Sequence, residues 1–222
     1  MELREYLSVR RAYNLVRQQQ DADVRLTFAE LAILCHMSAS GGKLNTSQIA
    51  EYQGVLRPTM THRTKHLSER GLINRTQGAE DRRNVACEIS EEGSTYMMEV
   101  CARICEELRR GAALTRTTPQ RVVRYVDAMG AFACRSGDLV LLGISGSPDM
   151  SCTVSNLVST LGLLQPTVSM SISSLEEEGL VVRDRPEGRS VRSVPIRLTV
   201  AGAEHVDDLI IQIRALVVRR DR

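Results

Sequence analysis

A duplication constrains the fold of this chain more than any other feature, because one stretch of its first half recurs in the second. The segment LRPTMTHRTKHLSERGLINR begins at Leu56, and its altered copy LQPTVSMSISSLEEEGLVVR begins at Leu164. The positions that agree are apolar residues at helical spacing and glycines at predicted turns, on which a fold depends. The sequence therefore predicts two copies of one structural unit.

The two copies align without a gap at an offset of 108 residues, which takes Gly71 to Gly179. Past the second copy the offset becomes 109, and one inserted residue costs least at the tip of a surface hairpin. We therefore divide the chain into residues 1–114, the first repeat with its flanking helices, and residues 115–222, a second and divergent repeat with flanking helices.

The first copy, residues 56–89, predicts a helix, a tight stop and a β-hairpin. Pro58 suits the first helical position, because its missing N–H would be unpaired there anyway. Gly71 fits the left-handed position that ends a helix. Two short apolar runs, residues 72–75 and 85–89, then flank a charged turn and are typical of paired strands.

The preceding segments complete a winged helix-turn-helix order. Residues 26–37 are almost continuously apolar and predict a buried helix, and the run Asn45-Thr46-Ser47-Gln48 resembles a capping box that opens a shorter one. Helix, turn, second helix and hairpin is the order in which a winged helix meets DNA. Its second helix enters the major groove, and its wing contacts the backbone or the minor groove.

Long amphipathic helices are predicted around each copy, at residues 2–20, at 91–114, after Pro119 and at the C-terminus. They carry more apolar surface than a small winged helix can cover, so we expect them to pack together, across the repeats or across chains. The predicted fold class is mainly α with small β-hairpin wings (α+β): two winged helix-turn-helix repeats on a shared bundle of long helices.

Composition excludes several classes of function. The net charge of +2 decides nothing, but an aromatic fraction of 3% without Trp argues against recognition of single strands by base stacking. The six cysteines lack the spacing of a zinc site, and no catalytic motif or phosphate loop occurs. The N-terminus is too charged for a signal peptide, and no apolar run is long enough to span a membrane. We expect a cytoplasmic protein that is not an enzyme and uses neither a metal nor a cofactor.

Cys101 and Cys105 lie one helical turn apart and leave two interpretations open. A redox switch needs an exposed thiol with a lowered pKa, and no Lys or Arg is obviously placed to lower it. Packing in the core is the interpretation we favour.

Candidate DNA contacts gather on the first repeat. Its helix carries donors for phosphates and base edges, with His62 or Arg63 the expected reader of guanine acceptors. Asp81 would orient an arginine at the wing tip, where a narrow minor groove attracts guanidinium groups. The alternatives are a solvated helix face and an ordinary charged turn. The candidates here are Thr46, Arg57, Thr59, Thr61, His62, Arg63, Lys65, Arg75, Asp81, Arg82 and Arg83.

The second repeat differs in charge. Its helix has no basic residue, and the three glutamates at 176–178 would repel phosphate if they faced DNA. Arginines around the second wing would still hold the DNA backbone. Our hypothesis is therefore that the first repeat supplies most of the affinity and the second mainly positions the chain on the DNA. The candidates here are Gln165, Thr167, Ser169, Arg183, Arg185, Arg189 and Arg192.

The wing segment GLINRTQGAEDRRNVACEISEEG resembles the signature of the MarR family. Asp81, Arg82 and Arg83 fall on the wing tip of that signature, and Gly93 on its closing glycine. The resemblance covers residues 26–110 well, whereas the second repeat departs from it at the wing. Two repeats in one chain are similar to fused members of the related SarA branch, in which one chain imitates a dimer.

This resemblance implies a bacterial transcription regulator that binds a pseudo-palindromic double-stranded DNA operator as a single-chain pseudo-dimer. In many members a small aromatic or lipophilic ligand, or cysteine oxidation, releases the DNA, so a small-molecule effector is an expected partner. Whether the chain also forms a homodimer stays open. The alternative is a tandem winged-helix scaffold for proteins, similar to the ScpB-type subunits of condensin complexes, and the acidic second helix keeps that alternative open.

Overall fold

The computed structural model describes residues 1–77, 85–111, 114, 116–184 and 194–218. The chain groups into two compact units. The first contains Gln19–Ala133 with the C-terminal residues, and we call it the N-repeat unit because it holds the winged helix of the first repeat. The second contains Met1–Gln18 and Cys134–Ala215, and we call it the C-repeat unit.

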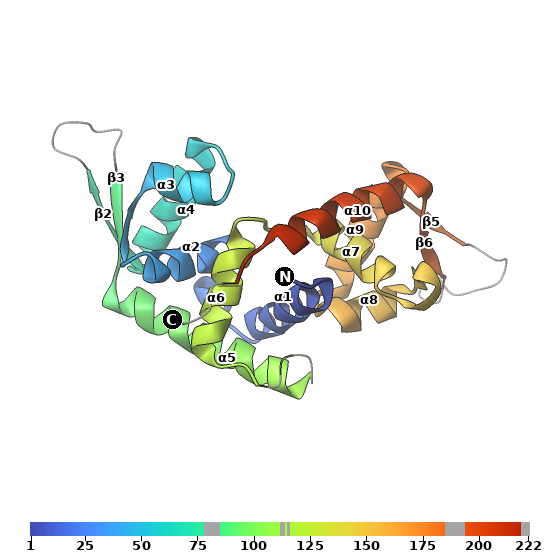
Figure 1. The fold of residues 1–222 in the computed structure, drawn as a ribbon, viewed down its shortest axis with the longest axis horizontal. Coiled ribbons are helices and arrows are strands. Elements are labelled where there is room, and N and C mark those ends of the chain that lie inside the picture. Colours follow the sequence, from blue (N-terminus) through green and yellow to red (C-terminus); the bar gives the residue numbers. More distant parts are fainter. Residues whose placement is uncertain (78–84, 112–113, 115, 185–193, 219–222) are drawn as a thin grey trace. The chain divides into compact units, whose positions relative to one another are not determined.

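The N-repeat unit follows the predicted order of helix, turn, helix and hairpin, and Figure 1 shows α3 and α4 beside α2, with the β2–β3 hairpin leading into the long helix α5. Helix α6 lies against α2 and α5 within the same unit. The elements are η1 (Ala22–Val24), α2 (Phe28–Ala39), β1 (Lys43–Asn45), α3 (Thr46–Tyr52), α4 (Arg57–Glu69), β2 (Ile73–Gln77), β3 (Val85–Ile89), α5 (Glu91–Arg110) and α6 (Pro119–Gly130).

The C-repeat unit repeats this order, and its helix α10 lies along α7 (Figure 1). Its elements are α1 (Leu3–Gln18), α7 (Ser136–Ser145), η2 (Pro148–Met150), β4 (Ser151–Cys152), α8 (Val154–Leu161), α9 (Gln165–Glu177), β5 (Val181–Arg183), β6 (Ile196–Leu198) and α10 (Val200–Ala215). Two winged helix-turn-helix units with small sheets confirm the predicted fold class. The shared bundle of flanking helices stays a prediction.

Each unit contains a three-stranded antiparallel sheet, with strand order β1-β3-β2 in one and β4-β6-β5 in the other. In each sheet the two longer strands form the predicted hairpin, β2 with β3 and β5 with β6. In the first hairpin Arg75 of β2 lies opposite Cys87 of β3. The third strand in each sheet was not predicted, because two or three residues carry no recognisable alternation. It ties the start of α3 or α8 to the wing.

The duplication seen in the sequence is a duplication in space. Helices α4 and α9 correspond residue for residue at the offset of 108, and both are followed by a glycine with positive φ, +69° at Gly71 and +73° at Gly179. The predicted capping box at α3 is confirmed, since Asn45 accepts from the Gln48 N–H and the Gln48 side chain accepts from the Asn45 N–H.

Helix α1, which begins the first repeat, belongs to the C-repeat unit. Helix α6, which begins the second repeat, belongs to the N-repeat unit. Helix α1 packs on α8, where Asn14 donates to the Leu161 carbonyl at 2.8 Å and Gln18 to the Gly162 carbonyl at 2.6 Å. Helix α6 packs in the N-repeat unit, where the Tyr52 hydroxyl donates to the Asp127 carbonyl at 2.5 Å. The predicted division after residue 114 therefore stays a prediction about the sequence repeat.

All six cysteines are buried and unoxidised. The predicted core packing of Cys101 and Cys105 is confirmed by their burial, which also raises the pKa of the Cys105 thiol. Within the described residues, every helix is too short or too polar to cross a lipid bilayer. The same residues contain no group of three or more His, Cys, Asp or Glu side chains arranged to hold a metal ion.

Candidate nucleic-acid interface

Helix α4 has one buried face and one exposed face, as the spacing of its residues predicts. Met60, Thr64 and Leu67 are buried, and the Thr64 hydroxyl is satisfied by donating to the Met60 carbonyl at 3.0 Å. The opposite face is polar and basic. Its exposed residues are Arg57, Pro58, Thr59, Thr61, His62, Lys65 and Glu69, and this set is called the α4 face below.

Lys65 is held only weakly within the α4 face. Its ammonium group lies 3.5 Å from the Glu69 carboxylate, one turn further along the helix, and both side chains are largely exposed. An exposed pair of this kind contributes little to stability, because water screens it. The Lys65 ammonium can therefore exchange its carboxylate partner for a phosphate at low cost.

Arg63 is oriented differently from the rest of the predicted set. It is half-buried, and its guanidinium donates to the Gln53 side-chain oxygen at 2.5 Å. Gln53 is itself buried and donates to the Ala29 carbonyl of α2 at 2.8 Å. The three residues connect α2, α3 and α4, so Arg63 holds the angle between the helices, while His62 beside it stays exposed.

A second connection, which the sequence reasoning missed, fixes the last turn of α4. His66 Nδ1 lies 2.5 Å from Glu30 Oε1, and Glu30 also accepts from the Thr27 N–H at 2.8 Å and the Thr27 hydroxyl at 2.7 Å. Burial would raise the pKa of Glu30, but the hydrogen bonds from Thr27 and His66 outweigh it and lower the pKa below 4.5. The Thr-x-x-Glu spacing of a capping box was the signal available in the sequence.

Two predicted contacts, Thr46 and Arg75, belong to the surroundings of the first sheet: Thr46 contacts it, and Arg75 is part of its strand β2. Thr46 is buried, and its hydroxyl donates to the Val85 carbonyl of β3 at 3.1 Å. Arg75 is half-buried beside the thiol of Cys87, and its charge opposes the rise in the Cys87 pKa that burial causes. The geometry gives Thr46 a structural part, joining α3 to the wing strand.

The remaining predicted contacts lie, in the sequence, between the strands of the two wings. The described strands end at Gln77 and resume at Val85, and Gln77 is exposed. Six predicted contacts lie outside the described residues, namely Asp81, Arg82, Arg83, Arg185, Arg189 and Arg192.

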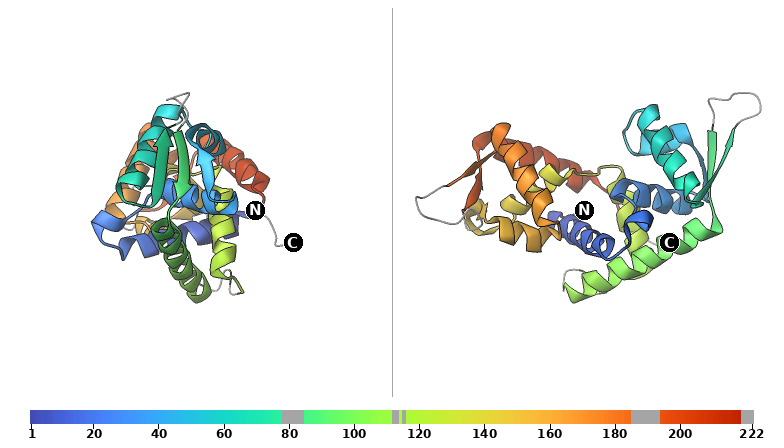
Figure 2. Two further views of the ribbon diagram at one scale, coloured as in Figure 1. Left: turned by 90° about the vertical axis from the view of Figure 1, so that its left-hand side faces the viewer. Right: turned by 180° about the vertical axis from the view of Figure 1, so that it is seen from behind.

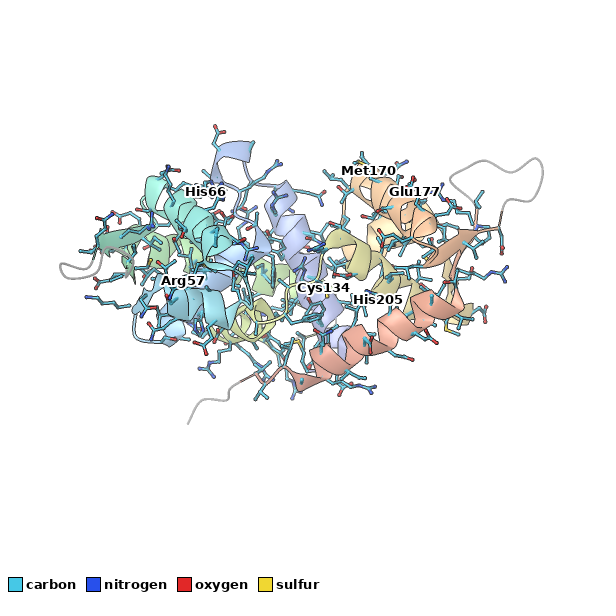
Figure 3. The ribbon with its side chains drawn as sticks, turned by 90° about the horizontal axis from the view of Figure 1, so that it is seen from above. Arg57, His66, Cys134, Met170, Glu177 and His205 are labelled. Carbon is cyan, nitrogen blue, oxygen red and sulfur yellow. The ribbon has the colours of Figure 1, made fainter. Side chains whose placement is uncertain are left out.

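Helix α9 exposes a neutral and partly apolar face. Met170 is 74% exposed, and Figure 3 shows it with Glu177 on the outer side of the helix. Thr167 and Ser169, two predicted contacts, are half-buried. The exposed residues are Gln165, Pro166, Met170, Ser173, Ser174 and Glu177, and this set is called the α9 face below.

Arg183 does not offset this lack of positive charge. It is a predicted DNA contact on β5, and its guanidinium lies 3.4 Å from the Glu176 carboxylate and donates to the Ser173 hydroxyl at 3.1 Å. Its side chain is only 18% exposed. The arginine therefore neutralises a carboxylate of its own unit.

A pocket of about 540 Å³ lies beside the end of α4 in the N-repeat unit. Arg70, which caps α4, forms part of its wall and donates to the Arg25 carbonyl. Apolar contact is available from Val24, Leu72 and Tyr96. The carboxylates in the lining are Asp23, Glu91, Glu92 and Glu99.

Two family models match the chain in tandem. A MarR family model matches residues 26–85, and a second MarR family model matches residues 139–190. Together the two matches cover just over half of the chain, and each contains the helix-turn-helix of one repeat.

Similar solved structures include the YusO protein from Bacillus subtilis, which is 28% identical, with 48% of this chain and 74% of that chain covered and a TM-score of 0.36. AbsC, a MarR family transcriptional regulator from Streptomyces coelicolor, is 23% identical, with 57% and 85% covered and a TM-score of 0.38. BpsR from Bordetella bronchiseptica, whose DNA binding is regulated by 6-hydroxynicotinic acid, is 20% identical, with 48% and 79% covered and a TM-score of 0.38. No curated protein matches significantly.

Proposed function

This chain belongs to the MarR family, and from that premise we propose that it binds a double-stranded DNA operator in a sequence-specific manner as a single-chain pseudo-dimer. It is a winged helix-turn-helix transcription regulator with two repeats and not an enzyme. We further propose that it acts in the cytoplasm, and that one chain supplies both winged helices to one operator.

The observation that carries the proposal is the α4 face. Arg57, His62 and Lys65 are exposed on the helix that a winged helix-turn-helix inserts into the major groove. Arg63 and His66 hold the helix from behind, through Gln53 and Glu30. A supported helix with exposed cationic side chains is suited to phosphate and base contacts, because the backbone that carries them is already ordered before binding.

The test is the salt dependence of binding to duplex DNA. Affinity should fall steeply as salt rises, because cationic side chains that contact phosphates release bound counterions. Replacing Lys65 by Ala should reduce the slope of log affinity against log salt by about 0.9, the value for one lost phosphate contact. Fluorescence anisotropy with a duplex selected from a random library measures both quantities.

Arg110→Ala is the matched control, since it removes one exposed positive charge at the far end of α5. The same loss of slope in both variants would mean that net charge alone is measured. Binding of no duplex at low salt would refute the DNA proposal and favour the alternative of a protein-binding scaffold.

We propose that a small aromatic effector binds the pocket beside α4. The pocket touches both the cap of α4 at Arg70 and the first turn of α5 at Glu91, so an occupant would contact the recognition helix and its support. Its carboxylates favour a cationic aromatic ligand over an anionic one. Benzamidinium should therefore raise the unfolding temperature and change DNA affinity more than benzoate does. Equal effects of the two ions, or none from either, would remove the pocket from consideration.

A further inference from the structure

The two recognition helices share a backbone and a buried face but differ at the positions that face outward. The buried Met60 and Leu67 of α4 are matched by the buried Val168 and Leu175 of α9. Outward, three pairs differ in chemistry: Arg57 corresponds to Gln165, His62 to Met170, and Lys65 to Ser173. The duplication keeps the buried residues that hold the helix and changes the exposed residues that would contact bases. The two helices therefore offer different surfaces to DNA.

Met170 is the distinctive residue of the α9 face. Its side chain is 74% exposed, and the side chains one turn away, Ser173 and Ser174, are polar and uncharged. Leu164, the residue before the helix start, is 53% exposed, and its counterpart Leu56 before α4 is 78% exposed, so the apolar difference between the two helices is Met170. Helical side chains lean toward the N-terminus, which brings the thioether toward this base-contacting end.

The glutamates of α9 do not oppose DNA at Met170. Glu176 is paired with Arg183 at 3.4 Å, and Glu178 accepts from the Ser174 hydroxyl at 2.9 Å. The exposed Glu177 lies two turns beyond Met170, about 10 Å along the helix axis. The acidic end and the apolar end of the α9 face are therefore separate.

In the major groove the thymine 5-methyl group is the base feature that an apolar side chain can recognise, because the others are hydrogen-bond donors and acceptors. A thioether placed against those polar groups would displace their bound water and would not replace the hydrogen bonds that the water made. Gln165 and Ser173 on either side of Met170 can still bond to phosphate or base edges. This chemistry points to thymine.

We propose that Met170 is a specificity-determining residue that contacts a thymine methyl group, so the half-site read by α9 differs from the half-site read by α4. The inference rests on the proposed function, since it requires that the chain bind duplex DNA. The operator then has unequal halves, with a required thymine methyl in one half and polar or charged recognition by Arg57 and His62 in the other.

The experiment removes the methyl group and the side chain separately and together. Duplexes are first selected from a random library by the full chain, and each thymine of the recovered sequence is then replaced in turn by deoxyuridine, which lacks only the methyl group. At one thymine the substitution should weaken binding of the native chain roughly fourfold, the equivalent of one buried methyl group. It should have no effect on the Met170→Ala variant, because the contact is already lost.

His62→Ala is the matched control at the corresponding position of α4, and it should keep the native sensitivity to the same deoxyuridine. Met170 is mostly exposed, so its replacement should leave the unfolding temperature unchanged and any change in binding is not a folding defect. A second selection with Met170→His should lose the thymine preference in one half of the site.

Two failures are distinguishable. If no duplex is enriched and none is bound at low salt, the proposed function fails, and this inference fails with it. If a duplex is bound but every deoxyuridine effect is the same for the native chain and Met170→Ala, the methyl contact is refuted while DNA binding stands. Sequence-independent loss of affinity in Met170→Ala would also overturn it.

Discussion

Gly93 and Gly202 lie in the first turn of α5 and of α10, where each helix packs closely on a backbone carbonyl just before a wing strand. A Cβ atom on Gly93 would lie 2.0 Å from the Leu72 carbonyl oxygen, and one on Gly202 would lie 2.0 Å from that of Leu180. In both repeats a hydroxyl residue completes the connection. Ser90 donates to the Gly71 carbonyl at 2.6 Å and accepts from the Gly93 N–H at 2.9 Å.

Thr199 makes the same two hydrogen bonds in the C-repeat unit, to the Gly179 carbonyl at 2.7 Å and from the Gly202 N–H at 3.1 Å. In the sequence Gly93 and Gly202 correspond at the offset of 109 that applies past the second copy. The sequence could not give the reason, because the contact is with a backbone oxygen about twenty residues away. Arg63 is a similar case: its position on the helix was predictable, but its bond to Gln53 depends on how α3 and α4 pack.

Replacing Gly93 or Gly202 by Ala should destabilise the corresponding unit by about 3 kcal/mol, since the clash is with backbone that cannot move without losing its own hydrogen bonds. Gly137→Ala is the control. Its Cβ would lie 3.6 Å from a Leu175 methyl carbon, an ordinary contact, and it should be neutral or stabilise α7 by up to about 1 kcal/mol. Urea unfolding of the three variants provides the comparison, and equal stabilities would contradict the argument.

At the scale of elements, the recognition helix α4 is held at its middle and at its last turn by the segments before it. The side-chain oxygen of Gln53, which caps the end of α3, accepts from Arg63 near the middle of α4, and the Glu30 carboxylate of α2 pairs with His66 in its last turn. The extent of α4 was largely predictable from Pro58 and Gly71. These connections were not, because polar side chains on a predicted helix look alike whether they face solvent or a neighbouring helix.

The Glu30 carboxylate makes this support dependent on pH. Its folded pKa is lowered by the hydrogen bonds from Thr27 and His66, which prevail over the effect of burial. A lowered folded pKa means that the ionised group stabilises the fold above its unfolded value near 4.5, and that this contribution is lost as pH falls through the folded value. Stability should therefore fall on the acidic side of 4.5.

Glu30→Gln should be less stable than the native chain by on the order of 1–2 kcal/mol at neutral pH, because the charge-assisted hydrogen bonds are weakened. The difference should shrink at an acidic pH below the folded pKa of Glu30, where the native carboxyl is protonated. Urea unfolding at the two pH values measures it, with Glu51→Gln on the exposed side of α3 as the control. A difference that stays constant with pH would exclude Glu30 as its source.

At the scale of the whole molecule, the exchange of first helices is the main departure from a simple chain of two domains. Figure 2 lets the reader follow α1 beside α8 and, separately, α6 beside α2. Both helices were predictable as amphipathic segments. Their placement was not, because an apolar stripe fits either repeat when the two repeats have similar cores.

A defect in α1 should therefore weaken the C-repeat unit, although α1 precedes the first repeat in the sequence. Asn14 is buried, and its amide donates to the Leu161 carbonyl at the end of α8. Asn14→Ala leaves that carbonyl without its donor, a change that costs about 1–3 kcal/mol in a buried setting. Amide hydrogen exchange should speed up in residues 154–161 and stay unchanged in residues 28–39, which lie in the N-repeat unit.

Ser8→Ala is the control on the same helix, because the Ser8 hydroxyl bonds only to the Arg4 carbonyl within α1. It should leave exchange in both segments as it is in the native chain. Faster exchange in residues 28–39 than in 154–161 of the Asn14→Ala variant would mean that α1 supports the first repeat after all. The reciprocal change weakens α6 at Asp127, whose carboxylate lies 2.8 Å from His36 Nδ1. Of the two segments, it should speed up amide exchange in residues 28–39 alone, because each repeat would depend on the helix that begins the other.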